Sequence, residues 1–464
     1  PAAGRLLFFI APVWLSFGLE RIVRTPFEYT WLIILFIVVS AAGVFSTTVG
    51  GSLEVNQSDR IKYEVGSDIR VVDVDGYSPQ GYRQFKERYK SITGIESVAL
   101  ALRLRAAAGP ANIEMLAVES FEFPDISWYR DDFSSRSLDS LMLALRSHNS
   151  TKKIIVPEEA VSIAVSLRPD KEYQNISMWI VMQGGRGVIR PVSLGNLGPS
   201  EWHSIAGRLP DGLTNPVSIE AVQLFEPGQG SVLTAGTVEI NEIVATTRSG
   251  KEHLLEDFEG FSRWTPIVTS ALRPDNIEIK LSSGSLGGKV AVFSFGEENI
   301  RGVRGFYNST TGGPVPVLLG SSFVDQTRIQ NGDMLVLEIA DRKIPVILVD
   351  TVDYFPTMDP HDEGFVIADI DSILWHLNIV GHQSQLYPNE VFLSEVSTDQ
   401  NAVRQDLSMM TLLSGQVLDK SEQLSTLETD PLLSAGWRSF GLVSVCLVVL
   451  LISISYFMYA IFFL

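Results

Sequence analysis

The chain is 464 residues long, carries a net charge of −18 at pH 7 and has a hydrophobic content of 45%. Such an acidic chain repels phosphate backbones and anionic headgroups, so nucleic acid is not expected as a partner. Its one cysteine, Cys446, excludes an intrachain disulfide, and core packing must therefore hold the fold together.

The first predicted elements are a cytoplasmic helix and a membrane-spanning helix. Residues 1–28 are interpreted as the end of a preceding apolar segment followed by a cytoplasmic amphipathic helix. Residues 29–49 carry no charge, and a helix of these 21 residues would cover roughly 31 Å, close to the hydrocarbon thickness of a bilayer. A signal peptide has a shorter apolar centre of ~7–15 residues, so this run is predicted to be a transmembrane helix. Arg21 and Arg24 precede it, and the positive-inside rule places them in the cytoplasm.

Residues 50–154 are predicted to form the first half of an extracytoplasmic α/β domain. They pass from a polar helical stretch into alternating strand-like residues and continue with a β-α-β-β-α rhythm, which is typical of a split α/β module. Residues 155–250 differ, because short alternating runs such as AVSIAVSLRP are separated by Gly, Pro and Asn with no helical pattern. This pattern predicts an inserted antiparallel β-sandwich of jelly-roll type that folds independently of its flanks.

Residues 251–439 are predicted to contain a linker and the second half of the α/β domain. Residues 440–464 carry no charge and are predicted to form a second transmembrane helix, with further crossings expected beyond it. The predicted fold class is an α+β membrane protein. Transmembrane helices flank a large extracytoplasmic α/β domain that contains the inserted sandwich, and the expected location is the cell membrane with multiple crossings.

Three common catalytic or metal-binding motifs and the phosphate-binding loop were looked for in the sequence and are not found. It contains no G-x-S-x-G, no H-E-x-x-H and no C-x-x-C, and the segment GSLGGKV lacks the spacing of a phosphate-binding loop. No catalytic residue, cofactor or metal is therefore expected, and the chain is predicted not to be an enzyme. Trp202 and Trp264 are the two candidates for stacking on a sugar ring, because jelly rolls often carry lectin-like sites.

Several stretches of the sequence resemble a known protein family. The stretches GLERIVRTPFEYT, GVFSTTVGGSLE and DRIKYEVGSDIRV, together with VPVLLGSSFVDQTRIQNGDMLVL and DPLLSAGWRSFGLVSVCLVVLL, are similar to FtsX/MacB-type ABC transporter permeases. The resemblance covers roughly residues 17–150 and 300–464 and consists of many loose positions. The sandwich departs from the compact exterior domain of that family, so no substrate is carried over.

The resemblance implies a permease subunit that does not hydrolyse ATP itself. A separate cytoplasmic ABC ATPase dimer would drive conformational change in the exterior domain, for export, lipid or lipoprotein handling, or mechanotransmission. Glu20, Arg21 and Arg24 would contact that ATPase. Further implied partners are the lipid bilayer, a second permease half and an extracytoplasmic protein. The alternative hypothesis is a membrane-tethered binding or adhesion protein with a carbohydrate-binding jelly roll.

Overall fold

Apolar and β-branched runs form more strand than helix in this chain. The computed structural model describes residues 26–78, 81–146, 153–226, 235–260, 263–268, 275–282, 288–296, 303–308, 314–360, 364–381, 385–396, 400–410, 415–429, 443, 445–454 and 457. Contacts divide the chain into two units, one made of Pro1–Lys62 with Lys420–Leu464 and the other of Tyr63–Asp419.

Helices account for what is described of the first unit. Helix α3 (Pro26–Val65) is 40 residues long and begins at a proline, which suits a first turn because the amide there needs no helical acceptor. Its last three residues belong to the second unit. Helix α10 (Lys420–Thr429) and a short apolar helix, Val445–Ile454, follow the second unit in the chain.

The predicted fold class is wrong. Strands make up 43% and helices 28% of the structure. Within the described ranges, Phe36–Val65 is the one helix long and apolar enough to cross a membrane. This composition does not fit a multi-span membrane protein with flanking transmembrane helices. The apolar run at 440–464, which was predicted to be a second crossing, lies partly outside the described residues, and Val445–Ile454 is a short apolar helix within it.

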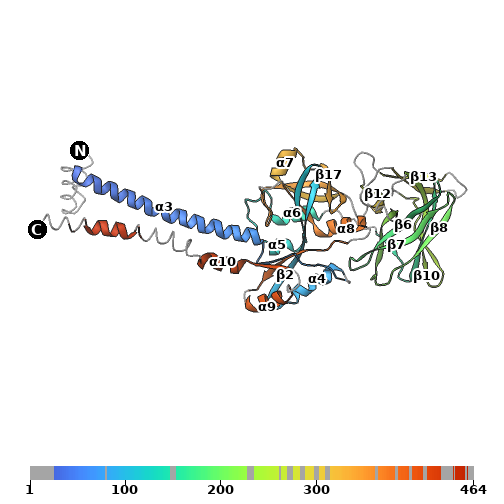
Figure 1. Cartoon of the computed structure of the whole chain (residues 1–464), viewed down its shortest axis with the longest axis horizontal. Coiled ribbons are helices and arrows are strands. Elements are labelled where there is room, and N and C mark those ends of the chain that lie inside the picture. Colours follow the sequence, from blue (N-terminus) through green and yellow to red (C-terminus); the bar gives the residue numbers. More distant parts are fainter. Residues whose placement is uncertain are drawn as a thin grey trace. The chain divides into compact units, whose positions relative to one another are not determined.

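A nine-stranded mixed sheet forms the centre of the second unit, with strand order β17-β18-β16-β19-β3-β2-β20-β1-β21. Strands from both sides of the sandwich insertion build it together, as the blue and orange ribbons show (Figure 1). Its strands are β1 (Ile69–Val72), β2 (Ile95–Ala108), β3 (Ala111–Val118), β16 (Val315–Gly320), β17 (Met334–Ile339), β18 (Arg342–Val352), β19 (Phe365–Asp369), β20 (Glu390–Glu395) and β21 (Gln416–Asp419).

Helices cover both faces of this sheet and bury two apolar clusters. One cluster receives residues from α4, α7, α8 and α9, and the other receives residues from α5 and α6. The helices are α4 (Tyr82–Lys90), α5 (Phe123–Ile126), α6 (Leu138–Leu145), α7 (Ser321–Thr327), α8 (Ile370–Val380) and α9 (Gln400–Met410). The strands are therefore buried on both sides, which explains continuous apolar runs such as Val315–Leu319.

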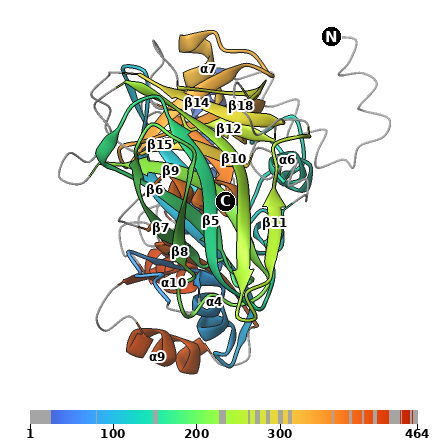
Figure 2. The same cartoon turned by 90° about the vertical axis from the view of Figure 1, so that its right-hand side faces the viewer.

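Two six-stranded antiparallel sheets pack face to face as the sandwich. One has the path β13-β14-β10-β5-β8 with β11 on β10, and the other β12-β15-β9-β6-β7 with β4 on β9. The strands are β4 (Ile154–Val156), β5 (Ala160–Pro169), β6 (Tyr173–Gln183), β7 (Ile189–Gly198), β8 (His203–Arg208), β9 (Val217–Phe225), β10 (Gly236–Thr247), β11 (Glu252–Glu256), β12 (Trp264–Pro266), β13 (Asn276–Leu281), β14 (Lys289–Phe295) and β15 (Arg304–Asn308). Strands β5, β8 and β10 lie nearest the viewer in Figure 2.

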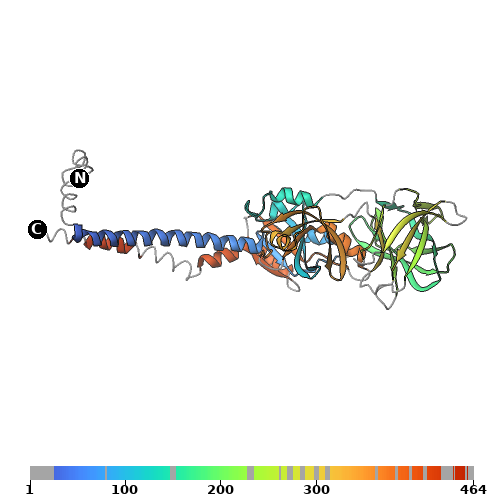
Figure 3. The ribbon, with the colours of Figure 1, turned by 90° about the horizontal axis from the view of Figure 1, so that it is seen from above.

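The sandwich extends further along the chain than the sequence indicated. Its strands run from Ile154 to Asn308, whereas residues 155–250 were predicted. The expected boundary falls in the turn between β10 and β11, where Gly250 adopts a φ of 77°. The Gly- and Ser-rich stretch SSGSLGG separates β13 from β14, and the region after residue 250 was therefore predicted to begin with a linker. Green to yellow colours mark this body in Figure 3.

Candidate functional site

The last turn of α3 is fixed to the loop that follows β18. The Tyr63 hydroxyl donates to the carbonyl oxygen of Met358 at 2.6 Å. The carbonyl of Tyr63 accepts from the amide of Thr357 at 2.9 Å. The Tyr63 ring also meets the Phe133 ring edge-on, with centroids 5.5 Å apart. Backbone, hydroxyl and ring therefore hold the helix end in one position.

Gly66 ends the helix at a place where only glycine fits. Its φ is 78°, the left-handed conformation that commonly follows a helix C-terminus. A Cβ atom there would lie 2.6 Å from Cγ2 of Thr357 and 3.2 Å from the Phe392 ring. Its carbonyl accepts from the amide of Trp128 at 2.9 Å. The glycine thus lets the chain turn from α3 into β1 against neighbouring side chains.

Replacing Gly66 with alanine is expected to destabilise the second unit by about 1–3 kcal/mol, because the left-handed backbone and the crowded Cβ are both unfavourable. Urea unfolding of the full chain in detergent measures this. The matched control is Gly51→Ala in the same helix, where a Cβ would meet nothing within 4 Å. Alanine at a helix interior is expected to be neutral or stabilising there. Equal effects of the two substitutions would contradict the assigned role of Gly66.

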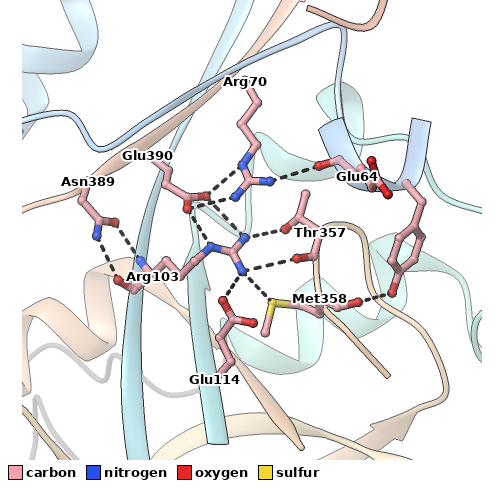
Figure 4. Close-up of polar contacts among 9 residues, drawn as sticks. Glu64, Arg70, Arg103, Glu114, Thr357, Met358, Asn389 and Glu390 are labelled. Atoms are coloured by element: carbon pink, nitrogen blue, oxygen red, sulfur yellow. Dashed lines mark hydrogen bonds and ion pairs between the residues drawn. The ribbon is translucent and has the colours of Figure 1, made fainter. Parts of the chain in front are cut away.

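An arginine–glutamate cluster lies next to this helix end (Figure 4). The cluster consists of Arg70, Arg103, Glu114 and Glu390. Arg70 comes from β1 and is 9% exposed. Its Nη1 donates to the carbonyl of Glu64 in α3 at 3.1 Å. Its Nε and Nη2 donate to the two carboxylate oxygens of Glu390 at 3.1 and 3.0 Å. One guanidinium therefore connects the last turn of α3 to strand β20.

Arg103 of β2 completes the cluster from the other side. Its Nε donates to Oε1 of Glu390 at 2.6 Å, and its Nη1 donates to Oε1 of Glu114 at 2.7 Å. Its Nη2 donates to the Thr357 hydroxyl at 2.6 Å, in the loop that also holds Tyr63. Asn389 bonds the backbone of Arg103 through both its amide nitrogen and its oxygen. The cluster thus joins α3, four strands and one loop.

Burial and charge set the protonation of this cluster. Burial acts to raise the pKa of Glu390, but the guanidiniums of Arg103 and Arg70 outweigh it and hold that pKa below its ordinary 4.5. Burial lowers the pKa of Arg70. For Arg103 burial also acts to lower the pKa, but Glu390 and Glu114 outweigh it and the net direction is upward. A carboxylate between two guanidiniums is therefore the stable state at neutral pH.

This pKa predicts an acid-dependent part of stability. Because the folded pKa of Glu390 lies below the unfolded value of 4.5, its contribution is complete above pH 4.5 and is lost as pH falls through the folded pKa. The free energy of unfolding of the parent is expected to fall with acidification, and Glu390→Gln is expected to lack that component. Urea unfolding of both proteins over a pH series measures the difference. Parallel curves below pH 4.5 would refute it.

The cluster is suited to mechanical linkage rather than catalysis. Its carboxylates accept from guanidiniums already committed to structural bonds, and no nucleophile with an adjacent base is among its members. The described residues contain no group of three or more His, Cys, Asp or Glu side chains that could hold a metal ion. What the geometry provides is a rigid, charge-assisted connection between a long helix and a sheet.

The residues predicted from sequence have different positions. Glu20, Arg21 and Arg24 lie outside the described residues. Trp264 is 4% exposed in the sandwich core and packs edge-on against Phe306, which leaves no ring face for a sugar. Trp202 is half-buried, and the Arg168 guanidinium lies over its ring at 5.2 Å.

Sequence reasoning missed the arginine–glutamate cluster. Arg70 and Glu390 are 320 positions apart, and no local motif connects them. One signal was present, since Arg70 is a charge within the apolar strand IRVV and needs a buried partner. The identity of that partner depended on strand pairing that the sequence pattern does not contain.

Neither a protein-family model nor a curated protein matches this chain. The resemblance to FtsX/MacB-type permeases therefore stays a prediction.

Proposed function

We propose that this chain is a non-catalytic coupling component of an FtsX/MacB-type transport system at a cell membrane. A separate ABC ATPase would hydrolyse the nucleotide. The chain would pass the resulting movement along helix α3 into the Tyr63–Asp419 unit. The absence of nucleotide-binding motifs and the sequence resemblance both favour this role over that of an enzyme.

The observation that carries the proposal is the connection at the end of α3. The candidate membrane-spanning segment Phe36–Val65 ends where Tyr63 bonds to the loop after β18 and Glu64 bonds to Arg70, all of them within the second unit. From Glu64 the contact passes through Arg70 to Glu390 and on to Arg103. A shift or rotation of the helix end would therefore displace β1, β20 and β2 together, because charge-assisted bonds in a buried setting resist separation.

The test uses the full chain purified from its native membrane with the ATP-cassette ATPase that is expected to copurify. Adding ATP is expected to change hydrogen exchange at amides of β1, β2 and β20. Arg70→Met is expected to abolish that change, because it removes the bond from Glu64 to Glu390. Tyr63→Phe, which removes one hydroxyl bond, is expected to weaken it and serves where Arg70→Met folds poorly by circular dichroism.

The matched control is Lys280→Met on β13 of the sandwich. Lys280 forms an ion pair with Glu278, and both side chains are exposed, at 59% and 49%. Removing an exposed pair is expected to leave the ATP-dependent exchange unchanged. Copurification without any ATP-cassette ATPase would overturn the proposal. An ATP response in Arg70→Met and Tyr63→Phe equal to that of the parent would overturn the route through the cluster.

The carbohydrate-binding alternative receives less support. One of its two candidate residues, Trp264, is buried and donates its indole N–H to Glu256 at 3.3 Å inside the sandwich. Trp202 alone provides one partly covered ring, whereas sugar sites usually combine stacking with several convergent polar groups. The coupling role is therefore the one that the geometry supports best.

A further inference from the structure

The sandwich and the α/β sheet meet at helix α8. An apolar cluster forms there from sandwich residues and from the end of α8, with the half-buried Trp375 packed against it. Its buried members are Val181, Ile189, Ala221, Ile267, Tyr307, Ile379 and Val380. The Tyr307 ring meets the rings of Trp375 and His376 edge-on, with centroids 5.8 and 5.4 Å apart. The two bodies thus share an apolar core with defined ring geometry.

Buried polar groups cross the same contact. Glu220 of β9 is 1% exposed, and one carboxylate oxygen accepts from Nε1 of Trp375 at 2.9 Å. The other oxygen accepts from the Ser218 hydroxyl. Gln223, also on β9 and 0% exposed, donates from Nε2 to the carbonyl of Ile379. Because a buried polar group is costly when its bond is lost, these pairs specify one orientation of β9 against α8.

Helix α8 is fixed to the α/β sheet at both ends. At its start, Asp369 at the end of β19 accepts from the amide of Ser372 at 3.1 Å as an N-cap. At its other end, Nη1 of the buried Arg342, from β18, donates to the carbonyl of Leu377 at 2.9 Å. The same helix is therefore bonded to the sheet on one side and to the sandwich on the other.

We propose that α8 is a rigid joint, with the partly buried Glu220–Trp375 hydrogen bond as its orienting contact, so that the sandwich moves with the α/β sheet as one body. The contacts of α8 support this joint whether or not the proposed coupling function holds. If the proposed coupling function also holds, movement of the sheet would pass through α8 to the sandwich, and the sandwich would pass it to an outside partner. This differs from an independent domain on a flexible linker, for which a smaller and more polar interface is typical.

The experiment measures the distance between the two bodies in the full chain. Cys446 is replaced by serine, and spin labels are attached to cysteines at the exposed positions Ser204 in the sandwich and Asn331 in the α/β part. Pulsed electron resonance is expected to give one narrow distance distribution. Trp375→Phe, which removes the indole donor to Glu220, is expected to broaden the distribution. The matched control is Trp179→Phe, which removes a similar indole bond to Ser177 within the sandwich and is expected to leave it narrow.

A second variant keeps the test decisive. If Trp375→Phe fails to fold by circular dichroism, Gln223→Leu, which removes the bond to Ile379, is expected to broaden the distribution instead. A broad distribution in the parent would overturn the joint. So would narrow distributions in both Trp375→Phe and Gln223→Leu. None of these outcomes depends on ATP or on a partner, so failure of the joint is distinguishable from failure of the coupling function.

Discussion

Replacing Glu390 with glutamine is expected to lower the free energy of unfolding by about 3–5 kcal/mol. The carboxylate accepts from both Arg70 and Arg103, and its side chain is only 5% exposed. Glutamine keeps the shape but leaves two buried guanidiniums without their shared negative charge. Urea unfolding of the full chain in detergent, followed by tryptophan fluorescence, measures the loss.

The matched control is Glu278→Gln on the outer surface of β13. Glu278 pairs with Lys280 at 2.6 Å, but both side chains are about half exposed, at 49% and 59%. Water and salt screen such a pair, so little change in stability is expected. A similarly small change for Glu390→Gln would show that the cluster does not hold the helix end, and the proposed route for coupling would lose its physical basis.

Period-2 alternation is the part of this fold that the sequence shows most directly. In AVSIAVSLRP the residues Ile163, Val165 and Leu167 are buried, and those between them are half-buried. Such alternation follows from the strand period and survives in a sheet with one face toward a core. The run VPVLLG contains no alternation, because every residue of β16 is buried on both faces.

Long-range pairing could not be predicted from the sequence. Strand β1 pairs with β20 through Ile69↔Leu393 and with β21 through Ile69↔Asp419, and nothing local in IRVV specifies either neighbour. The candidate site is made by those pairings, since Arg70 and Glu390 come together only when β1 and β20 do. Trp264 was misinterpreted for a related reason, because β12 pairs with β15 and its strand pattern is only three residues long.

Replacing Arg304 with methionine is also expected to cost about 3–5 kcal/mol, because the change removes one member of a fully buried ion pair. Arg304 begins β15 and Asp275 directly precedes β13, so the pair joins the two sheets of the sandwich. Nη1 of Arg304 lies 2.5 Å from Oδ1 of Asp275, and both side chains are 0% exposed. The same oxygen accepts from the amide of Gly296 at 3.2 Å. Urea unfolding measures the loss.

The double substitution Arg304→Met with Asp275→Leu separates two explanations of that loss. If the cost comes from a buried carboxylate left without its guanidinium, removing the carboxylate as well is expected to recover much of the stability, since apolar replacement of a buried ion pair is often neutral or better. If the bonds of the pair themselves hold the sheets together, the double variant is expected to be no more stable than the single one. Recovery would mean that the pair fixes how β13 and β15 are aligned more than it stabilises the sandwich. In that case the double variant, although stable, is expected to lose the narrow distance between labels at Ser204 and Asn331, because β15 carries Tyr307 to the contact with α8.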